Sequence, residues 1–182
     1  MTAPSADESY PEIRAAVRAV CANFPGEYWR KLDAERKYPS EFIRALTEAG
    51  FLAALIPEAY GGSGLGLREA AAILEEIQKS GGNGAAGHAQ MYTMGTILRH
   101  GSEEQKRTYL PKIASGELRL QAFGVTEPSS GTDTSRIRTQ AVKDELGYRI
   151  NGQKVWTSRA EHSDLMLLLA RTAPRAETEN PH

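Results

Sequence analysis

The chain has 182 residues, of which 40% are hydrophobic and 25% are charged, and its formal net charge is −1 at pH 7. This length and apolar content are enough for a globular protein with a core, of one domain or slightly more. The near-zero charge argues against a nucleic-acid partner, because binding to phosphate backbones needs a surplus of basic residues.

The N-terminus and the cysteine content indicate the compartment. The first ten residues, M-T-A-P-S-A-D-E-S-Y, carry acids and no apolar stretch, which is typical of neither a signal peptide nor an Arg-rich transit peptide. No run approaches the ~20 apolar residues that a membrane helix needs. Cys21 is the only cysteine, which excludes an internal disulfide and suits a reducing compartment. We therefore expect a cytoplasmic protein with no membrane partner.

Helical spacing of apolar residues dominates the first part of the chain. Residues 1–9 show no such pattern and are expected to be frayed. The spacing predicts helices over residues 11–22, 39–50, 67–79, 85–100 and 102–115, and Gly50 is expected to cap the second of them. Residues 27–38 are expected to form a loop or a weak helix. Ser102 and Gln105 match a capping box at the start of the last of these, and Pro111 should kink it or end a segment.

Two glycine-rich stretches interrupt the helical pattern. Residues 51–57 (F-L-A-A-L-I-P) are apolar throughout and too short for a buried helix, so we expect a buried extended connection, with a flexible turn in the glycines that follow. Gly82, Gly84 and Gly87 satisfy G-x-G-x-x-G, but a helical pattern precedes them where the dinucleotide fingerprint needs a strand. We therefore predict no cofactor phosphate at 82–87.

From Arg119 the period of the apolar pattern changes to two. This predicts strands over residues 119–126, 136–143, 147–156 and 164–171, with turns at 144–147 and 151–152 and an unstructured tail after Pro174. The predicted fold class is α+β, in which a helical domain over residues 1–117 is followed by part of an antiparallel β domain over residues 118–182. Four strands leave sheet edges without partners, so we expect exposed apolar surface there.

Two stretches of the second part suggest a binding site. Residues 121–133 (Q-A-F-G-V-T-E-P-S-S-G-T-D) have the composition of a strand that enters a small polar loop, which can bring N–H groups and hydroxyls to an anion or a heterocycle. Residues 150–160 (I-N-G-Q-K-V-W-T-S-R-A) place a Trp beside two hydroxyls. Either stretch taken separately is more commonly an ordinary strand and turn.

Taken together, the two stretches resemble the flavin-binding region of the acyl-CoA dehydrogenase family. The resemblance rests on V-T-E-P-x-x-G-[ST]-D followed some twenty residues later by N-G-x-K-x-W-[IT]-[TS]. It extends to P-E-A-Y-G-G-S-G at 57–64 and G-S-E-E-Q-K-R-T-Y-L-P-K-I-A-S-G-E at 101–117, and covers residues 39–171. It implies an FAD-dependent oxidoreductase of fatty acid metabolism, with an acyl-CoA substrate, an electron-transfer acceptor protein and a homo-oligomer when the protein is complete.

The resemblance also implies roles for individual residues. Phe123, Val125 and Thr126 would face the flavin ring, and Thr126 would bond its pyrimidine edge. Gly131 and Thr132 would approach the flavin pyrophosphate, with Thr132 also near the acyl-CoA. The remaining cofactor residues would be Trp156, packed by the ring, and two donors near flavin O4 and N5, Thr157 and Ser158. The sequence differs from the common pattern in having Phe at 123 where many members have Tyr, and Thr at 157 where Ile is common.

No residue of the chain is assigned as the catalytic base or as a metal ligand. In the family resembled, the carboxylate that removes the α-proton comes from a C-terminal helical domain that follows the β domain. Glu127 lies in the motif, where we expect its carboxylate to stabilise the turn. The histidines at 88, 100 and 162 lack metal-ligand spacing. On this basis we expect an incomplete chain that turns over no substrate alone.

Two other functions are compatible with the sequence. The chain could be a non-catalytic binding or assembly module that kept the fold and lost the base. It could also be a helical binding protein without flavin, which a yellow preparation would exclude. Helix 85–100 leaves a further choice open, because Met91 and Met94 suit either flexible core packing or, by the family resemblance, the lining of an acyl-chain pocket.

Overall fold

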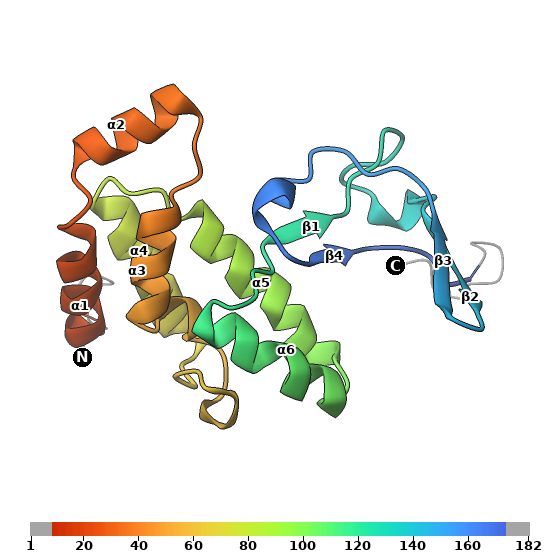
Figure 1. The fold of residues 1–182 in the computed structure, drawn as a ribbon, viewed down its shortest axis with the longest axis horizontal. Coiled ribbons are helices and arrows are strands. Elements are labelled where there is room, and N and C mark those ends of the chain that lie inside the picture. Colours follow the sequence, from red (N-terminus) through yellow and green to blue (C-terminus); the bar gives the residue numbers. More distant parts are fainter. Residues whose placement is uncertain (1–8, 174–182) are drawn as a thin grey trace, which may run out of the picture. The chain divides into compact units, whose positions relative to one another are not determined.

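A computed structural model describes residues 9–173, so the expectations for the first eight residues and for the tail from Pro174 lie outside the described residues. The chain divides into two compact units, Met1–Leu120 and Gln121–His182. The first unit, from α1 to α6 in Figure 1, contains α1 (Pro11–Cys21), α2 (Gly26–Glu35), α3 (Ser40–Glu48), α4 (Leu67–Lys79), α5 (Ala85–His100) and α6 (Glu103–Ser115). Within the described range no helix is both long and apolar enough to cross a membrane.

The helices pack around one apolar core, as their spacing predicts. The fully buried side chains of this core include Val17 of α1, Phe42 and Leu46 of α3, and Ile73 of α4. Helix α2, expected as a loop or a weak helix, forms over ten residues and buries none of them completely. Its aromatic residues nevertheless pack at the edge of the core, where the rings of Trp29 and Phe42 lie 4.9 Å apart in an edge-to-face arrangement.

Ion pairs also connect helices α1 and α4. Arg14 is buried and donates to Glu76 at 2.7 Å and to Glu75 at 2.7 Å, while Arg18 donates to Glu76 at 2.9 Å. Hydrogen bonds from Arg14 and then Arg18 outweigh the effect of burial and hold the pKa of the Glu76 carboxyl below its usual value. Apolar periodicity gives no signal for these partners, because they are more than 50 residues apart in the sequence.

Residues 51–56, between α3 and α4, are buried or half-buried as expected, but the expectation of an extended chain is wrong. The segment begins with a short 3₁₀ helix, η2 (Phe51–Ala53), and continues after Pro57 into a second one, η3 (Glu58–Tyr60). The chain then folds back, so that Leu65 N–H donates to Ala54 O at 2.8 Å. A Cβ at Gly62 would lie 2.0 Å from Ile56 O, so only glycine permits this close return.

Helix α6 begins at the predicted capping box. Gln105 N–H donates to Ser102 Oγ at 3.1 Å, and Ser102 N–H donates to the Gln105 side chain at 2.8 Å. The helix does not end at Pro111 but continues to Ser115. Pro111 and Arg107 both lie on the exposed side, where water can hydrate the carbonyl that loses its partner, while Leu110 is buried on the other side.

The second unit contains four short strands, β1 (Ala122–Gly124), β2 (Gln140–Asp144), β3 (Gly147–Asn151) and β4 (Met166–Leu168), and two 3₁₀ turns, η4 (Thr134–Arg136) and η5 (Ala160–His162). Strands β2 and β3 form an antiparallel hairpin, and β1 and β4 lie side by side in parallel (Figure 1). The predicted α+β class, with helices first and strands second, is confirmed. The parallel pair is an addition that the pattern did not indicate, since a pairing partner 44 residues away leaves no mark on local periodicity.

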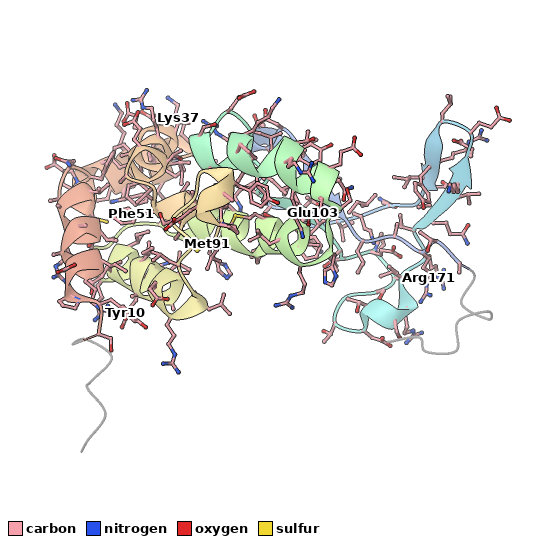
Figure 2. All side chains as sticks on the ribbon, turned by 90° about the horizontal axis from the view of Figure 1, so that it is seen from below. Tyr10, Lys37, Phe51, Met91, Glu103 and Arg171 are labelled. Atoms are coloured by element: carbon pink, nitrogen blue, oxygen red, sulfur yellow. The ribbon has the colours of Figure 1, made fainter. Side chains whose placement is uncertain are left out.

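The strands are shorter than their patterns predict. Strand β3 ends at Asn151, although alternation continues to Trp156. Just beyond it, Gly152 lies against Thr139 so closely that a Cβ would be 2.4 Å from the Thr139 hydroxyl oxygen. Arg171, labelled in Figure 2, ties the end of the described chain to the segment before β2. Its guanidinium donates to Ile137 O at 2.8 Å and also to Ser135 O.

Candidate functional site

The two stretches singled out in the sequence meet in the second unit. Val155 N–H donates to Thr126 O at 2.9 Å, which joins the segment after β3 to the segment after β1. One residue earlier, Lys154 Nζ donates to Val125 O, also at 2.9 Å. These bonds bring Val125 and Thr126 close to the segment that continues into Trp156, Thr157 and Ser158. The two groups are far apart in the sequence, and only the fold brings them together.

Glu127 is the polar centre of this junction. Its buried carboxylate accepts the N–H of Arg138 at 2.6 Å, the N–H of Thr139 at 2.8 Å and Nζ of Lys154 at 2.9 Å. Burial by itself raises the pKa of this carboxyl, but the bonds from Thr139, Arg138 and Lys154 outweigh it and lower the pKa to about 2. The expectation that Glu127 stabilises the turn agrees with this geometry, whereas Lys154, its partner, was missed by the sequence reasoning.

The loop after Glu127 is short and held by its own bonds. Glu127 and Ser130 exchange backbone hydrogen bonds at 2.8 and 3.2 Å, and Ser130 Oγ donates to Asp133 O at 2.6 Å. Between these anchors Gly131 and Thr132 are exposed, and a Cβ at Gly131 would meet no atom within 4 Å. The loop therefore presents an open backbone surface that a flat or anionic ligand can approach.

The segment from Trp156 to Arg159 has an unusual backbone. Trp156 and Arg159 both have φ of 60°, a left-handed conformation that is uncommon for residues with a Cβ. The Trp156 side chain is 88% exposed, which is unusual for a large aromatic residue. Strained backbone of this kind is typical of ligand-binding segments, and here it sets the direction of the two residues between, Thr157 and Ser158.

The predicted site residues fall into three groups. Val125 and Thr126 are brought to the Trp156–Ser158 segment by the hydrogen bonds above. Gly131 and Thr132 lie in the loop that follows Thr126 by way of Glu127. Phe123 is the central residue of β1, half-buried and paired in register with Leu167. The roles that the family resemblance gave to these residues stay predictions.

Other candidate features lie in the helical unit. Met91 and Met94 of α5 are buried in the core, which favours flexible packing for these two side chains. The opposite side of α5 carries Tyr92, whose exposed ring lies 5.2 Å from that of His88. The glycines at 82–87 follow the helix α4, as the argument against a dinucleotide site assumed. No group of three or more His, Cys, Asp or Glu suited to a metal occurs among residues 9–173.

A cleft of about 390 Å³ also lies in the helical unit, and none of the predicted site residues lines it. It is open and of mixed charge, with Arg44 and Glu48 of α3 on one side and Gly116 and Arg119 after α6 on the other. The exposed loop and Trp segment of the second unit, rather than this cleft, combine hydroxyl donors with a flat aromatic surface.

The chain matches two family models, "Acyl-CoA dehydrogenase, N-terminal domain" over residues 7–117 and "Acyl-CoA dehydrogenase, middle domain" over residues 122–181. It is 33% identical over 172 residues to the acyl-CoA dehydrogenase FadE12 of Mycobacterium tuberculosis strain H37Rv, covering 91% of this chain and 42% of that one. It is 38% identical over 135 residues to (2S)-methylsuccinyl-CoA dehydrogenase of Cereibacter sphaeroides, covering 74% and 24%.

Solved structures of related proteins are similar to this chain over nearly all of its length. The crystal structure of an acyl-CoA dehydrogenase from Geobacillus kaustophilus superposes with a TM-score of 0.86 at 32% identity, over 99% of this chain and 47% of that one. A structure of an electron transferring flavoprotein of Acidaminococcus fermentans gives 0.81 at 29% identity, over 95% and 45%. The chain thus spans less than half the length of these relatives.

Proposed function

Since this chain belongs to the acyl-CoA dehydrogenase family, we propose that it contributes the flavin-binding part of an FAD-dependent α,β-dehydrogenation of an acyl-CoA thioester. The observation that carries the proposal is the bond from Val155 N–H to Thr126 O, which brings two stretches with flavin-site composition to one place. The assignment of residues 1–117 and 118–182 to a helical and a β domain is part of this proposal.

The donors of the junction fit a flavin. Within the described residues, the hydroxyls of Thr126, Thr157 and Ser158 have no hydrogen-bond partner in the protein, so they are available to a ligand. The exposed ring of Trp156 offers a flat apolar surface, and the open space at Gly131 admits the close approach of a pyrophosphate. Hydroxyl donors beside an aromatic ring match the polar edge and the flat body of an isoalloxazine.

The residues of this chain would bind and orient the cofactor. Thr126 would donate to the pyrimidine edge, Thr157 and Ser158 to the oxygen and nitrogen where negative charge develops, and Trp156 would pack beside the ring. Gly131 and Thr132 would meet the pyrophosphate, with Thr132 also near the acyl-CoA. FAD, when bound, supplies the acceptor for the β-hydride of the substrate.

The α-proton of the substrate needs a base within hydrogen-bond reach. Glu127, the carboxylate of the junction, is engaged by Lys154 and two backbone N–H groups, and its low pKa makes it a poor proton acceptor. We therefore propose that residues 1–182 by themselves catalyse no dehydrogenation. An electron-transfer acceptor protein, a homo-oligomeric assembly and a cytoplasmic location belong to the proposal as well.

Flavin binding tests the proposal directly. Titration of FAD into the purified chain should quench the fluorescence of Trp156 and saturate, while Trp156→Ala should bind FAD more weakly and lose that part of the quench. Reduction of a dye by acyl-CoAs of graded chain length should stay at the background rate with residues 1–182 alone. A chain that neither quenches nor retains FAD would contradict the proposed site and leave the non-catalytic module as the better interpretation.

The hydroxyl of Ser158 gives a finer test. One hydrogen bond to a charged group contributes about 1.5–3 kcal/mol, which corresponds to a roughly ten- to hundredfold change in rate. In an enzyme that combines this chain with a base for the α-proton, Ser158→Ala should slow flavin reduction by an acyl-CoA by that factor in stopped-flow absorbance, and Ser158→Thr should restore it. Reduction of Ser158→Ala at the wild-type rate would exclude this role.

A further inference from the structure

The side chain of Lys154 is almost fully buried, which is unusual for a lysine. Its side chain is 7% exposed and that of Glu127 is 3% exposed, and Nζ lies 2.9 Å from the carboxylate. The same ammonium donates to Val125 O at 2.9 Å. One side chain thus binds both the residue before Thr126 and the residue after it.

Glu127 extends this connection to a third segment. The oxygen that accepts Lys154 also accepts the N–H of Thr139, and the second oxygen accepts the N–H of Arg138. The ion pair therefore links the segment after β1, the segment before β2 and the segment after β3. Each of these bonds has a fixed direction, so the three segments can meet in only one register.

The position of the pair in the sequence matters as much as its geometry. Glu127 directly follows Thr126, and Lys154 stands two residues before Trp156. The pair thus lies immediately behind both halves of the proposed flavin site, while neither charge is exposed to a ligand. A buried ion pair contributes little net stability compared with apolar residues of similar size. Its role here therefore lies in the geometry of the segments that it connects.

We propose that Lys154 and Glu127 form a positioning pair, which sets the register of residues 154–158 against residues 125–127 and thereby places the hydroxyls and the Trp around the flavin. The part of this inference that concerns the flavin rests on the proposed function. The register itself does not, because it follows from the hydrogen bonds of the chain alone.

Amide hydrogen exchange of the 182-residue chain tests the register without any cofactor. The variants are Lys154→Met, Lys154→Arg and Glu127→Gln, with Lys143→Met, an exposed lysine of β2, as the matched control. In Lys154→Met and Glu127→Gln, the amides of Arg138, Thr139 and Val155 should exchange at least tenfold faster, while those of α4 stay unchanged. Lys154→Arg, which keeps the charge, should restore most of the protection.

Binding of FAD tests whether the register of these segments positions the flavin-binding residues. At a temperature where circular dichroism shows each variant to be folded, Lys154→Met should bind FAD at least tenfold more weakly. The visible spectrum of any flavin that it retains should move toward that of free FAD. A purely structural role would lower the melting temperature and leave the affinity and spectrum of the folded protein unchanged. If Lys154→Met unfolds the second unit, Lys154→Arg and Glu127→Gln, which keep more of the original shape, decide the outcome.

The results separate the two proposals. Wild-type exchange rates at Val155, Arg138 and Thr139 in Lys154→Met, or wild-type affinity and spectrum, would overturn the positioning pair. If the wild-type chain itself binds no FAD, the proposed function fails, and the exchange rates alone then decide whether the pair sets the register.

Discussion

The two units bury polar and apolar side chains in different proportions. In the helical unit most of the buried residues are apolar, among them the large side chains of Phe42, Leu46 and Ile73, although the ion pair of Arg14 and Glu76 is buried there as well. In the second unit the buried apolar residues are mostly small, and they lie beside buried polar residues, namely Gln121, Glu127, Ser130, Ser135 and Thr139. The large apolar side chains of its hairpin are exposed, Tyr148 by 57% and Ile150 by 53%.

This difference indicates two ways of fixing a structure. Apolar burial is non-directional and scales with area, so the helical unit obtains stability from volume and tolerates small shifts in geometry. Hydrogen bonds are directional, so the second unit, which buries few apolar side chains and several polar ones, obtains a defined loop geometry from few contacts. The predicted cofactor residues lie in the second unit, where the directions of hydrogen bonds fix the positions of the loops.

Phe42→Ala should give the largest effect. Its ring is fully buried and packs edge-to-face against Phe24 and Trp29. Removal of a buried Phe ring costs about 3–5 kcal/mol, so urea unfolding followed by helical circular dichroism should shift to much lower urea. Leu67→Ala, at an exposed position at the start of α4, is the control and should shift little. Equal shifts for the two variants would contradict the assignment of the core.

Acid should affect the second unit next. The pKa of Glu127 is about 2, against an ordinary value of 4.5, so its carboxylate favours the folded state. That contribution is fully present above pH 4.5 and is lost as the pH falls through the folded value, toward pH 2. Exchange of the Arg138 and Thr139 amides, corrected for intrinsic rates, should therefore stay protected down to about pH 4 and lose protection between pH 4 and 2. Glu127→Gln should remove this dependence.

Ser102→Ala should give a moderate effect. It removes the hydroxyl that accepts Gln105 N–H at the start of α6, which costs about 0.5–2 kcal/mol. The loss should appear as a lower unfolding midpoint for the helical unit, with Ser102→Asp, another good N-cap, close to the wild-type value. A midpoint unchanged in Ser102→Ala would show that the capping box adds no stability in this chain.

The smallest effect is expected on the hairpin. Val142 is 61% exposed, so Val142→Thr should change the free energy of unfolding by no more than about 0.5 kcal/mol. Together with Ile150→Thr it should reduce light scattering at high protein concentration, because exposed apolar strands promote association. A large loss of stability would mean that these side chains are covered, and would remove the contrast between the two units.

The sequence predicted every helix except α2, which was expected as a loop or a weak helix, because each of the others carries its own apolar spacing. The 3.6-residue spacing of apolar residues predicted both ends of α4 correctly, and the Ser102–Gln105 pattern predicted the start of α6. The same local information could not show that 51–53 would form a 3₁₀ turn, because that turn depends on the return of the chain past Gly62 to Ile56 and Ala54.

For the site, the sequence by itself identified the residue types and the family motifs from Gln121 to Asp133 and from Ile150 to Ala160. Only the tertiary structure decided that Thr126 and Val155 are joined, that Lys154 is buried against Glu127, and that Trp156 stands exposed in a left-handed conformation. Local propensity and periodicity act over a few residues, whereas the first two of these features come from directional bonds between segments that lie 27 or more residues apart.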